Sequence, residues 1–171
     1  YRAEIAKSCV ESGADMINDI SAGNMDSKML YVIAEMNIPY IMMHMQGIPE
    51  NMQKNPIYEN VINDILSFFQ QKIDILEKKG FEKIIIDPGF GFGKTLEHNY
   101  KLLNNLKDFK KLGFPILVGL SRKSMIYNLL DTTPQHALNG TSITNTIALQ
   151  NGANILRVHD VKEAIECIKI T

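Results

Sequence analysis

The stretch IIIDPGFGFGKT, residues 84–95, changes from three isoleucines to an aspartate, a proline and three glycines. A short, continuous apolar run of this kind is typical of a strand that is buried on both faces of a parallel sheet. Asp87 follows the isoleucines directly, so it stands where the buried strand ends and the chain turns toward the next helix. The stretch therefore predicts an α/β fold with a carboxylate at the carboxyl end of a strand.

The glycines after Asp87 do not match a nucleotide-binding loop. A P-loop has a glycine, four residues and then Gly-Lys-Thr, because its backbone N–H groups surround the phosphates. Residues 93–95 supply the end of that pattern, but Pro88 occupies the position of the first glycine and has no N–H. The G-x-G-x-G spacing at 89–93 also differs from the dinucleotide fingerprint. Two interpretations remain: the glycines relieve steric strain in a turn, or they bring the backbone close to a ligand.

Composition bounds the class of protein. The 171 residues suffice for one domain with a sizeable core, and 45% are apolar. The net charge of −1 gives no reason to expect nucleic acid or an anionic membrane as a partner. There is neither a long apolar stretch nor a signal peptide pattern, so a cytoplasmic location is expected. Cys9 and Cys167 have no metal-site spacing and are expected to be two buried thiols in a reducing cytoplasm.

Short apolar runs alternate with longer helical patterns along the whole chain. Strands are predicted at residues 14–20, 39–44, 83–87, 115–120 and 154–159. Helices are predicted at residues 1–13, 26–36, 57–80, 96–111, 135–151 and 160–170, the last with Asp160 as its N-cap. Five such βα units predict a parallel sheet covered by helices.

Every predicted strand ends in polar or charged side chains. In chain order these are Asn18 and Asp19; His44; Asp87; Ser121, Arg122 and Lys123; and Arg157, His159 and Asp160. The carboxyl ends of parallel strands share one face, which is the catalytic face in a (β/α)₈ TIM barrel. An open sheet would concentrate its ligand groups at one switch point instead. Polar groups at all five ends therefore favour part of a barrel.

Five stretches at these ends resemble the dihydropteroate synthase family, the pterin-binding barrel enzymes of folate synthesis. They are INDISAG (17–23), MHMQGIPENMQ (43–53), DPGFGFGKTLEHN (87–99), VGLSRKSMI (118–126) and RVHDV (157–161), in family order. The resemblance implies one pterin-binding domain over residues 1–171, with roughly strands 4–8 of the barrel and without its first βα units. Methyltetrahydrofolate methyltransferases also use a pterin-binding barrel but lack the SRKS-type and RVHDV-type pair.

The resemblance also implies a transferase reaction. In it, p-aminobenzoate displaces pyrophosphate from 6-hydroxymethyl-7,8-dihydropterin diphosphate and gives dihydropteroate. It further implies Mg²⁺ on the diphosphate with no metal ligand in this segment, a homodimer through the helix at 137–150, and membership of a class of enzymes that sulfonamides target. Two mobile loops and an aspartate of the family are missing, so the isolated segment is expected to be inactive. A non-catalytic pterin-binding fragment and a pterin-binding methyltransferase are the alternatives.

The proposed pterin contacts begin with Asp87, whose carboxylate can accept two N–H groups from the amino-amide edge of a pterin. The alternative for Asp87 is an N-cap, although Thr95 is better placed to cap the next helix. Asn18 can both donate to and accept from the same ring. In the family pattern Lys123 lies at the pterin carbonyl. The resemblance adds space at Gly119 and contacts from Met43 and Phe92.

The remaining candidates lie on the diphosphate and p-aminobenzoate side. Arg157 can stack on a ring while it donates to an anion, and His159 points the same way because it is two residues along the strand. With Lys123 these two are the expected catalytic residues. Ser121 lies at the p-aminobenzoate position, and Ser124 is either an anion contact or a simple helix cap. His44 is left open between the site and the core. His98 and His136 are interpreted as surface helix residues without a role.

Overall fold

The computed structural model describes residues 1–171 and contains five parallel strands that neighbour one another in chain order. They are β1 (Ile17–Asp19), β2 (Tyr40–Met43), β3 (Ile84–Asp87), β4 (Leu117–Val118) and β5 (Ile155–Leu156). The first three form one sheet and the last two a second, and a single parallel bridge between Ile86 and Ile116 joins the two. The parallel α/β sheet predicted from the sequence is confirmed.

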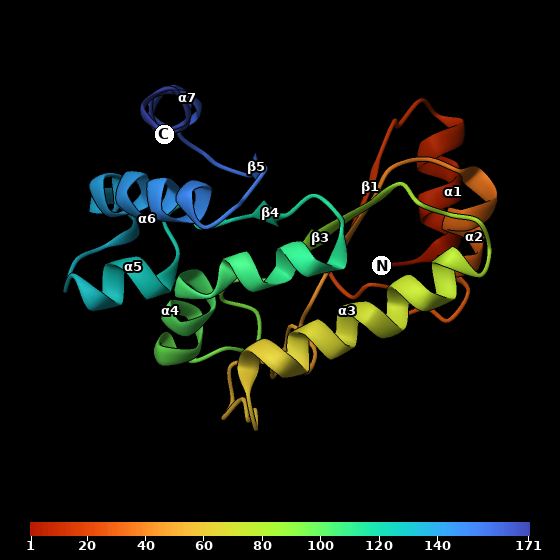
Figure 1. Cartoon of the computed structure of the whole chain (residues 1–171), viewed down its shortest axis with the longest axis horizontal. Coiled ribbons are helices and arrows are strands. Elements are labelled where there is room, and N and C mark those ends of the chain that lie inside the picture. Colours follow the sequence, from red (N-terminus) through yellow and green to blue (C-terminus); the bar gives the residue numbers. More distant parts are fainter.

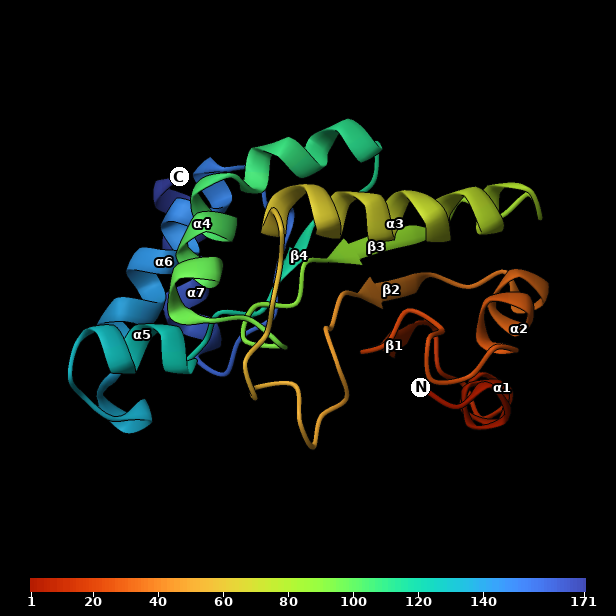
Figure 2. The same cartoon turned by 90° about the horizontal axis from the view of Figure 1, so that it is seen from below.

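Helices follow the strands and form the two ends of the molecule. They are α1 (Ala3–Glu11), α2 (Met29–Met36), α3 (Val61–Glu77), α4 (Leu96–Asn104), the 3₁₀ helix η1 (Leu106–Leu112), α5 (Ser124–Leu129), the 3₁₀ turn η2 (Pro134–His136), α6 (Leu138–Gln150) and α7 (Val161–Ile170). In Figure 1, α5, α6 and α7 gather at one end and α1 and α2 at the other, with the strands between them. Figure 2 shows α3 running alongside β3.

The two faces of the strands are buried to different degrees. Residues on one face, such as Met42 and Ile86, join a cluster of 30 buried residues that includes the apolar side of α3. Residues on the other face form a cluster of only three, Ile41, Ile85 and Leu117, with Ile155 packed against it. Side chains alternate along a strand, so this division follows from the sequence period of two. The helices therefore cover one face of the strands, and a thin apolar layer covers the other.

Side-chain caps explain where two helices begin. Asn60 accepts hydrogen bonds from the backbone of Ile62 and Asn63, so α3 starts at Val61 and not at residue 57. Thr95 caps α4 in a capping box with His98. This confirms the expectation that Thr95 is better placed than Asp87 to cap this helix. His98 thus has a structural role that the sequence analysis did not assign.

Three other expectations need correction. The helix predicted at 96–111 divides into α4 and η1 at Asn105, and the one at 135–151 consists of η2 and α6. Asp160 occupies the N-cap position of α7, but its side chain makes no capping bond. Of the two cysteines, only Cys167 is buried, since Cys9 lies on the exposed side of α1.

None of the helices combines the length and the apolar character that crossing a membrane requires.

Candidate functional site

Asp87 ends β3 as a fully buried carboxylate with two different partners. Its Oδ1 accepts a hydrogen bond from the backbone N–H of Gly89 at 2.9 Å. Its Oδ2 accepts from Nη2 of Arg157 at 2.8 Å. The Asp87 side chain is 1% exposed, whereas that of Arg157 is 42% exposed. One carboxylate oxygen is therefore held by the protein backbone, and the other by a side chain that solvent reaches.

Arg157 joins the ends of three strands. It extends from the end of β5, and its Nη1 donates to Oδ1 of Asn18 at 3.1 Å, a residue 139 positions away in the sequence. Its guanidinium lies over Gly119, where an added Cβ would be 2.9 Å from Nη2. Three residues predicted to share a site, Asn18, Asp87 and Arg157, are therefore in direct contact.

Lys123 approaches the same region from the loop after β4. Its Nζ donates to the carbonyl of Phe90 and lies 4.8 Å from the centroid of the Phe92 ring. The pKa of Lys123 is lowered to about 8, chiefly by burial; the charge of Asp87 opposes this change and that of Arg157 adds to it. The ammonium thus sits between an aromatic face and two charged groups of the site.

Ser121 and His159 form the other half of the site. Oγ of Ser121 accepts from the backbone N–H of His159 at 3.3 Å and lies 3.1 Å from its Nδ1. A hollow of about 170 Å³ lies at this end of the strands. Its lining consists of Gly119, Ser121, Lys123, Arg157, Val158 and His159. Apart from Val158, every one of them was a candidate site residue.

The remaining candidates are more peripheral. Met43 is almost fully buried, and its side chain lies against Gly89. Phe92 is half-buried, and Ser124 is exposed as the first residue of α5. Asp19 is buried in a local network, where it accepts hydrogen bonds from the Ser21 hydroxyl and the Tyr40 hydroxyl. Asp19 therefore supports the end of β1 and does not face the hollow.

An ion pair between Arg122 and Asp160 ties the two loops on either side of this hollow together. Nε and Nη2 of Arg122 donate to the two carboxylate oxygens of Asp160, both at 2.9 Å. Nη1 donates to the carbonyls of Pro134 and Gln135 at 2.9 Å. The hydrogen bonds from Arg122 lower the pKa of Asp160. Because both carboxylate oxygens of Asp160 accept from Arg122, Asp160 does not cap α7. The sequence analysis did not predict this ion pair.

Lys94 is a second residue that the sequence analysis did not assign to the site. The residue is 3% exposed, and its Nζ donates to the carbonyls of Gly89 at 2.8 Å and Phe92 at 3.1 Å. It also lies 3.1 Å from Nδ1 of His44. Burial lowers the pKa of Lys94 to about 7. His44 is buried against this lysine, which favours the core interpretation of His44.

The strand ends do not form a magnesium site. No group of three or more His, Cys, Asp or Glu side chains lies close enough to hold an ion. Asp87, the buried carboxylate at this face, is already bonded to Arg157 and Gly89. Mg²⁺ in proteins commonly keeps waters and substrate phosphates as ligands, with one or two carboxylates. The residues present therefore do not fit a metal held by this chain.

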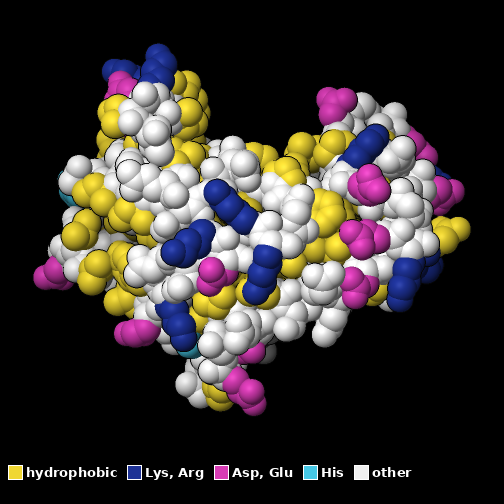
Figure 3. Space-filling view, viewed as in Figure 1, with side chains coloured by type: hydrophobic (Ala, Val, Ile, Leu, Met, Phe, Trp, Pro, Cys, Tyr) yellow, Lys and Arg dark blue, Asp and Glu magenta, His cyan; other side chains and the backbone are white.

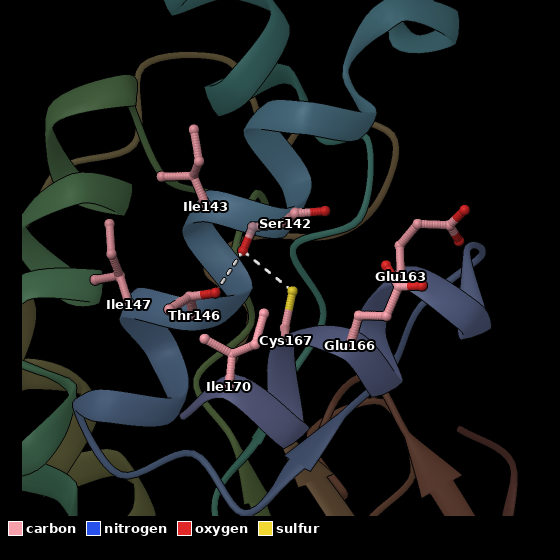
Figure 4. A pocket seen from close by; sticks show the side chains of 8 residues that line it. All are labelled: Ser142, Ile143, Thr146, Ile147, Glu163, Glu166, Cys167 and Ile170. Carbon is pink, nitrogen blue, oxygen red and sulfur yellow. Dashed lines mark hydrogen bonds between the residues drawn. The ribbon is translucent and has the colours of Figure 1, made fainter.

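A second hollow, of about 380 Å³, lies between α6 and α7, away from the strand ends (Figure 4). Its lining includes Ile143, Ile147 and Ile170. Two of its polar side chains, Thr146 and Cys167, donate to the carbonyl of Ser142. The carboxylates of Glu163 and Glu166 also line the hollow, whose surface is mainly apolar.

Parallel strands in chain order, helices between them and polar groups at their carboxyl ends define an α/β protein with its ligand site at the strand ends. A family model described as pterin binding enzyme matches residues 1–159. The chain is 43% identical to a dihydropteroate synthase of Haemophilus influenzae over 99% of this chain and 62% of the relative. The chain belongs to the pterin-binding enzyme family.

Solved structures agree with this assignment. A Yersinia pestis dihydropteroate synthase in a sulfonamide drug complex matches with a TM-score of 0.93 and 42% identity, over 98% of this chain and 62% of that one. A Clostridium difficile dihydropteroate synthase in the presence of pteroic acid matches with a TM-score of 0.91 and 34% identity, over 99% and 63%. The chain thus spans less than two thirds of the length of these relatives.

Proposed function

We propose that this chain is the pterin-binding part of a dihydropteroate synthase, a transferase of folate synthesis. The observation that carries the proposal is Asp87, a buried carboxylate whose neighbours Arg157 and Lys123 are cations at the edge of an adjacent hollow. A pterin has a planar edge with two N–H donors, which one carboxylate can accept side by side. A site that bonds this edge also rejects rings that lack it.

Ligand binding would require Arg157 to change partners. Oδ2 of Asp87 and Oδ1 of Asn18 both accept from this guanidinium, so it occupies the groups that we assign to the pterin. Because Arg157 is half exposed, it can move off Asp87 at low cost when the pterin edge takes its place. The freed guanidinium is then available to stack on the ring and to bind an anion.

The cations support the group transfer itself. The amine of p-aminobenzoate forms a C–N bond to the methylene carbon of the dihydropterin diphosphate and loses a proton. The C–O bond breaks, and its electron pair leaves with pyrophosphate. The electron-rich ring stabilises positive charge on the carbon, so the protein needs to hold the leaving group and position the amine. We assign the leaving group to Lys123, Arg157 and His159, and the amine side to Ser121 and Ser124.

Several wider features belong to the same proposal. We place β1–β5 as roughly strands 4–8 of a (β/α)₈ barrel, with the thin apolar layer of Ile41, Ile85 and Leu117 on its inner side. Figure 3 supports this arrangement, because the molecule is open between α7 and α1. Residues 1–171 alone would then be inactive. We further propose a cytoplasmic enzyme that sulfonamides inhibit, and Mg²⁺ carried by the diphosphate.

We also propose a homodimer through α6. The exposed apolar residues Ile143 and Ile170 lie beside the hollow between α6 and α7, and they support an interface there. Burial of such residues in a second copy would remove apolar surface from water.

Pyrophosphate release by the full-length protein tests the proposed reaction, with dihydropterin diphosphate and p-aminobenzoate as substrates. We expect turnover in the unaltered protein and none from residues 1–171 alone. Arg157→Gln should lower kcat/KM about 100-fold, as expected when a donor to the charge that develops on the leaving group is removed. Binding of a pterin without the diphosphate should change far less. Absence of turnover, or equal losses for both ligands, would contradict the proposal.

A further inference from the structure

Lys94 is the only lysine or arginine that is buried in this chain, and the proposed reaction does not use it. Lysine is almost never fully buried unless it is paired, because removing its charge from water is costly. A buried ammonium beside the strand ends therefore needs a reason. Its surroundings are the loop between β3 and α4, residues 88–95, and the end of β2.

Three acceptors surround the ammonium, which has three N–H groups to donate. They are the carbonyls of Gly89 and Phe92 and Nδ1 of His44. His44 can accept only when its Nδ1 carries no proton. Burial lowers the pKa of His44 well below its ordinary value, and the charge of Lys94 lowers it further, so the ring is neutral. In the tautomer with the ring proton on Nε2, the three donors of the ammonium match these three acceptors.

Gly89 connects this cation to the site. Its carbonyl accepts from Lys94, and its N–H donates to Oδ1 of Asp87 at 2.9 Å. Gly89 has a φ of +70°, and an added Cβ would lie 1.9 Å from the carbonyl oxygen of His44. The backbone here touches the end of β2 and has no space in which to shift. Both backbone hydrogen-bonding groups of Gly89 are therefore engaged: the N–H by Asp87, and the carbonyl by Lys94 together with the backbone N–H of Phe92 at 3.1 Å.

We propose that Lys94 is a positioning residue for Asp87: its ammonium fixes Gly89, whose N–H holds one carboxylate oxygen and leaves the other directed at the ligand. Lys94 does not touch the ligand. The inference rests on the proposed role of Asp87 in pterin recognition. Four titratable groups surround Lys94 from the packed elements, namely His44, Asp87, His98 and Lys123.

The loop has a second anchor that serves as a matched control. The hydroxyl of Tyr58 donates to the carbonyl of Gly93 at 2.7 Å, at the far end of the same loop from Asp87. Tyr58→Phe removes a hydrogen bond from the loop but leaves Lys94 and Gly89 in place. It separates a general loss of loop stability from a specific loss of carboxylate orientation.

Two probes test the inference in the full-length protein: oxidised 6-hydroxymethylpterin, which needs Asp87, and inorganic pyrophosphate, which does not. We expect Lys94→Met to weaken pterin binding about tenfold or more, since small misplacements of a positioned group have effects of this size. Pyrophosphate binding should change less than about threefold, and Tyr58→Phe should leave both affinities within about threefold. Calorimetric titration measures all of them.

Pterin affinity like that of the unaltered protein in Lys94→Met would overturn the inference alone. Equal losses for both probes, or an equal loss in Tyr58→Phe, would also overturn it, because they indicate a purely structural role. Absence of pterin binding by the unaltered protein would overturn the proposed function. If Lys94→Met does not fold, the hydrogen-exchange rate of the Gly89 amide in the unaltered protein is the test. We expect this amide to be protected. Exchange as fast as in an unfolded chain would contradict the inference.

Discussion

Two loops at the carboxyl ends of the strands are held in opposite ways. The loop after β3, residues 88–95, surrounds the buried ammonium of Lys94 with its own carbonyls. The loop after β4, residues 121–123, is held by its own Arg122, whose guanidinium donates to both carboxylate oxygens of Asp160 in the neighbouring loop. One loop is organised around an internal cation, and the other is fastened by a partly exposed ion pair.

The difference predicts how well each half of the site should tolerate substitutions. A buried charge must keep every partner, because an unpaired polar group in the interior has a large free-energy cost. The loop around Lys94 also lies in backbone contact with the end of β2 at Gly89. A solvent-accessible ion pair is screened and exchanges its partners with water. The loop that follows Asp87 should therefore be rigid and sensitive to substitution, and the loop that presents Lys123 should be adjustable.

The largest expected effect comes from adding one methyl group at Gly89. Its φ is +70° and the new Cβ would meet the His44 carbonyl at 1.9 Å. Gly113 is a matched control, because its φ is +80° but nothing lies within 4 Å of an added Cβ. We expect Gly89→Ala to lower the free energy of unfolding by more than about 3 kcal/mol, against about 1 kcal/mol for Gly113→Ala. Equal losses in urea unfolding would show that the loop can yield.

Removing the charge of Asp87 should have the next largest effect. Asp87→Asn retains the shape of the side chain but places an N–H donor against the N–H donors of the pterin. We expect pterin affinity to fall about 100-fold, as for other truncated charge pairs. Asp15→Asn, at an exposed position, should have no effect on the same titration. Similar affinities for the two variants would remove Asp87 from the recognition site.

The pH dependence of stability probes the buried cation. Because the pKa of Lys94 is lowered from 10.5 to about 7 on folding, the unfolded chain binds more protons between these values. Stability should therefore rise with pH across this window, and the contribution of Lys94 should be constant below pH 7. Between pH 7 and 9, the free energy of unfolding should rise by about 2 kcal/mol more in the unaltered protein than in Lys94→Met. Parallel curves from urea unfolding would contradict a buried ammonium.

The external ion pair should give the smallest effect. Arg122→Gln loosens the loop that presents Lys123, so pyrophosphate affinity should fall about fivefold while pterin affinity, for which Asp87 is the main group, falls less. Asp160→Asn should do the same, and the double variant should be no worse than either single one, because both remove one interaction. Lys107→Gln, an exposed lysine in η1, controls for loss of positive charge. Additive losses would show that the two residues act separately.

Much of the fold could be predicted because strands that are buried on both faces appear in the sequence as short, continuous apolar runs. The isoleucine run at 84–86 and the βα alternation identified all five strands and their parallel pairing. The predicted ends of helices and strands were less accurate, because these ends depend on capping side chains and on neighbouring strands. Asn60 starts α3 late, and β4 and β5 have only two residues each because pairing is limited to the segment that faces a neighbouring strand.

The site could be predicted where topology alone brings residues together. Asn18, Asp87 and Arg157 are far apart in sequence, but parallel strands place their carboxyl ends on one face. Lys94 and Arg122 could not be assigned, since their roles depend on tertiary contacts with backbone carbonyls. The Gly93-Lys94 pair was compared with a phosphate-binding loop and did not match it. In the structure, Lys94 donates to a carbonyl of its own loop.

The account rests on Asp87 as the group that recognises a pterin, and a crystal structure of the full-length protein with a bound pterin tests this most directly. The amino-amide edge should lie within about 3 Å of the Asp87 carboxylate, with Arg157 moved off Oδ2 and placed along the ring. A pterin bound elsewhere, with the contact between Asp87 and Arg157 intact, would contradict the account.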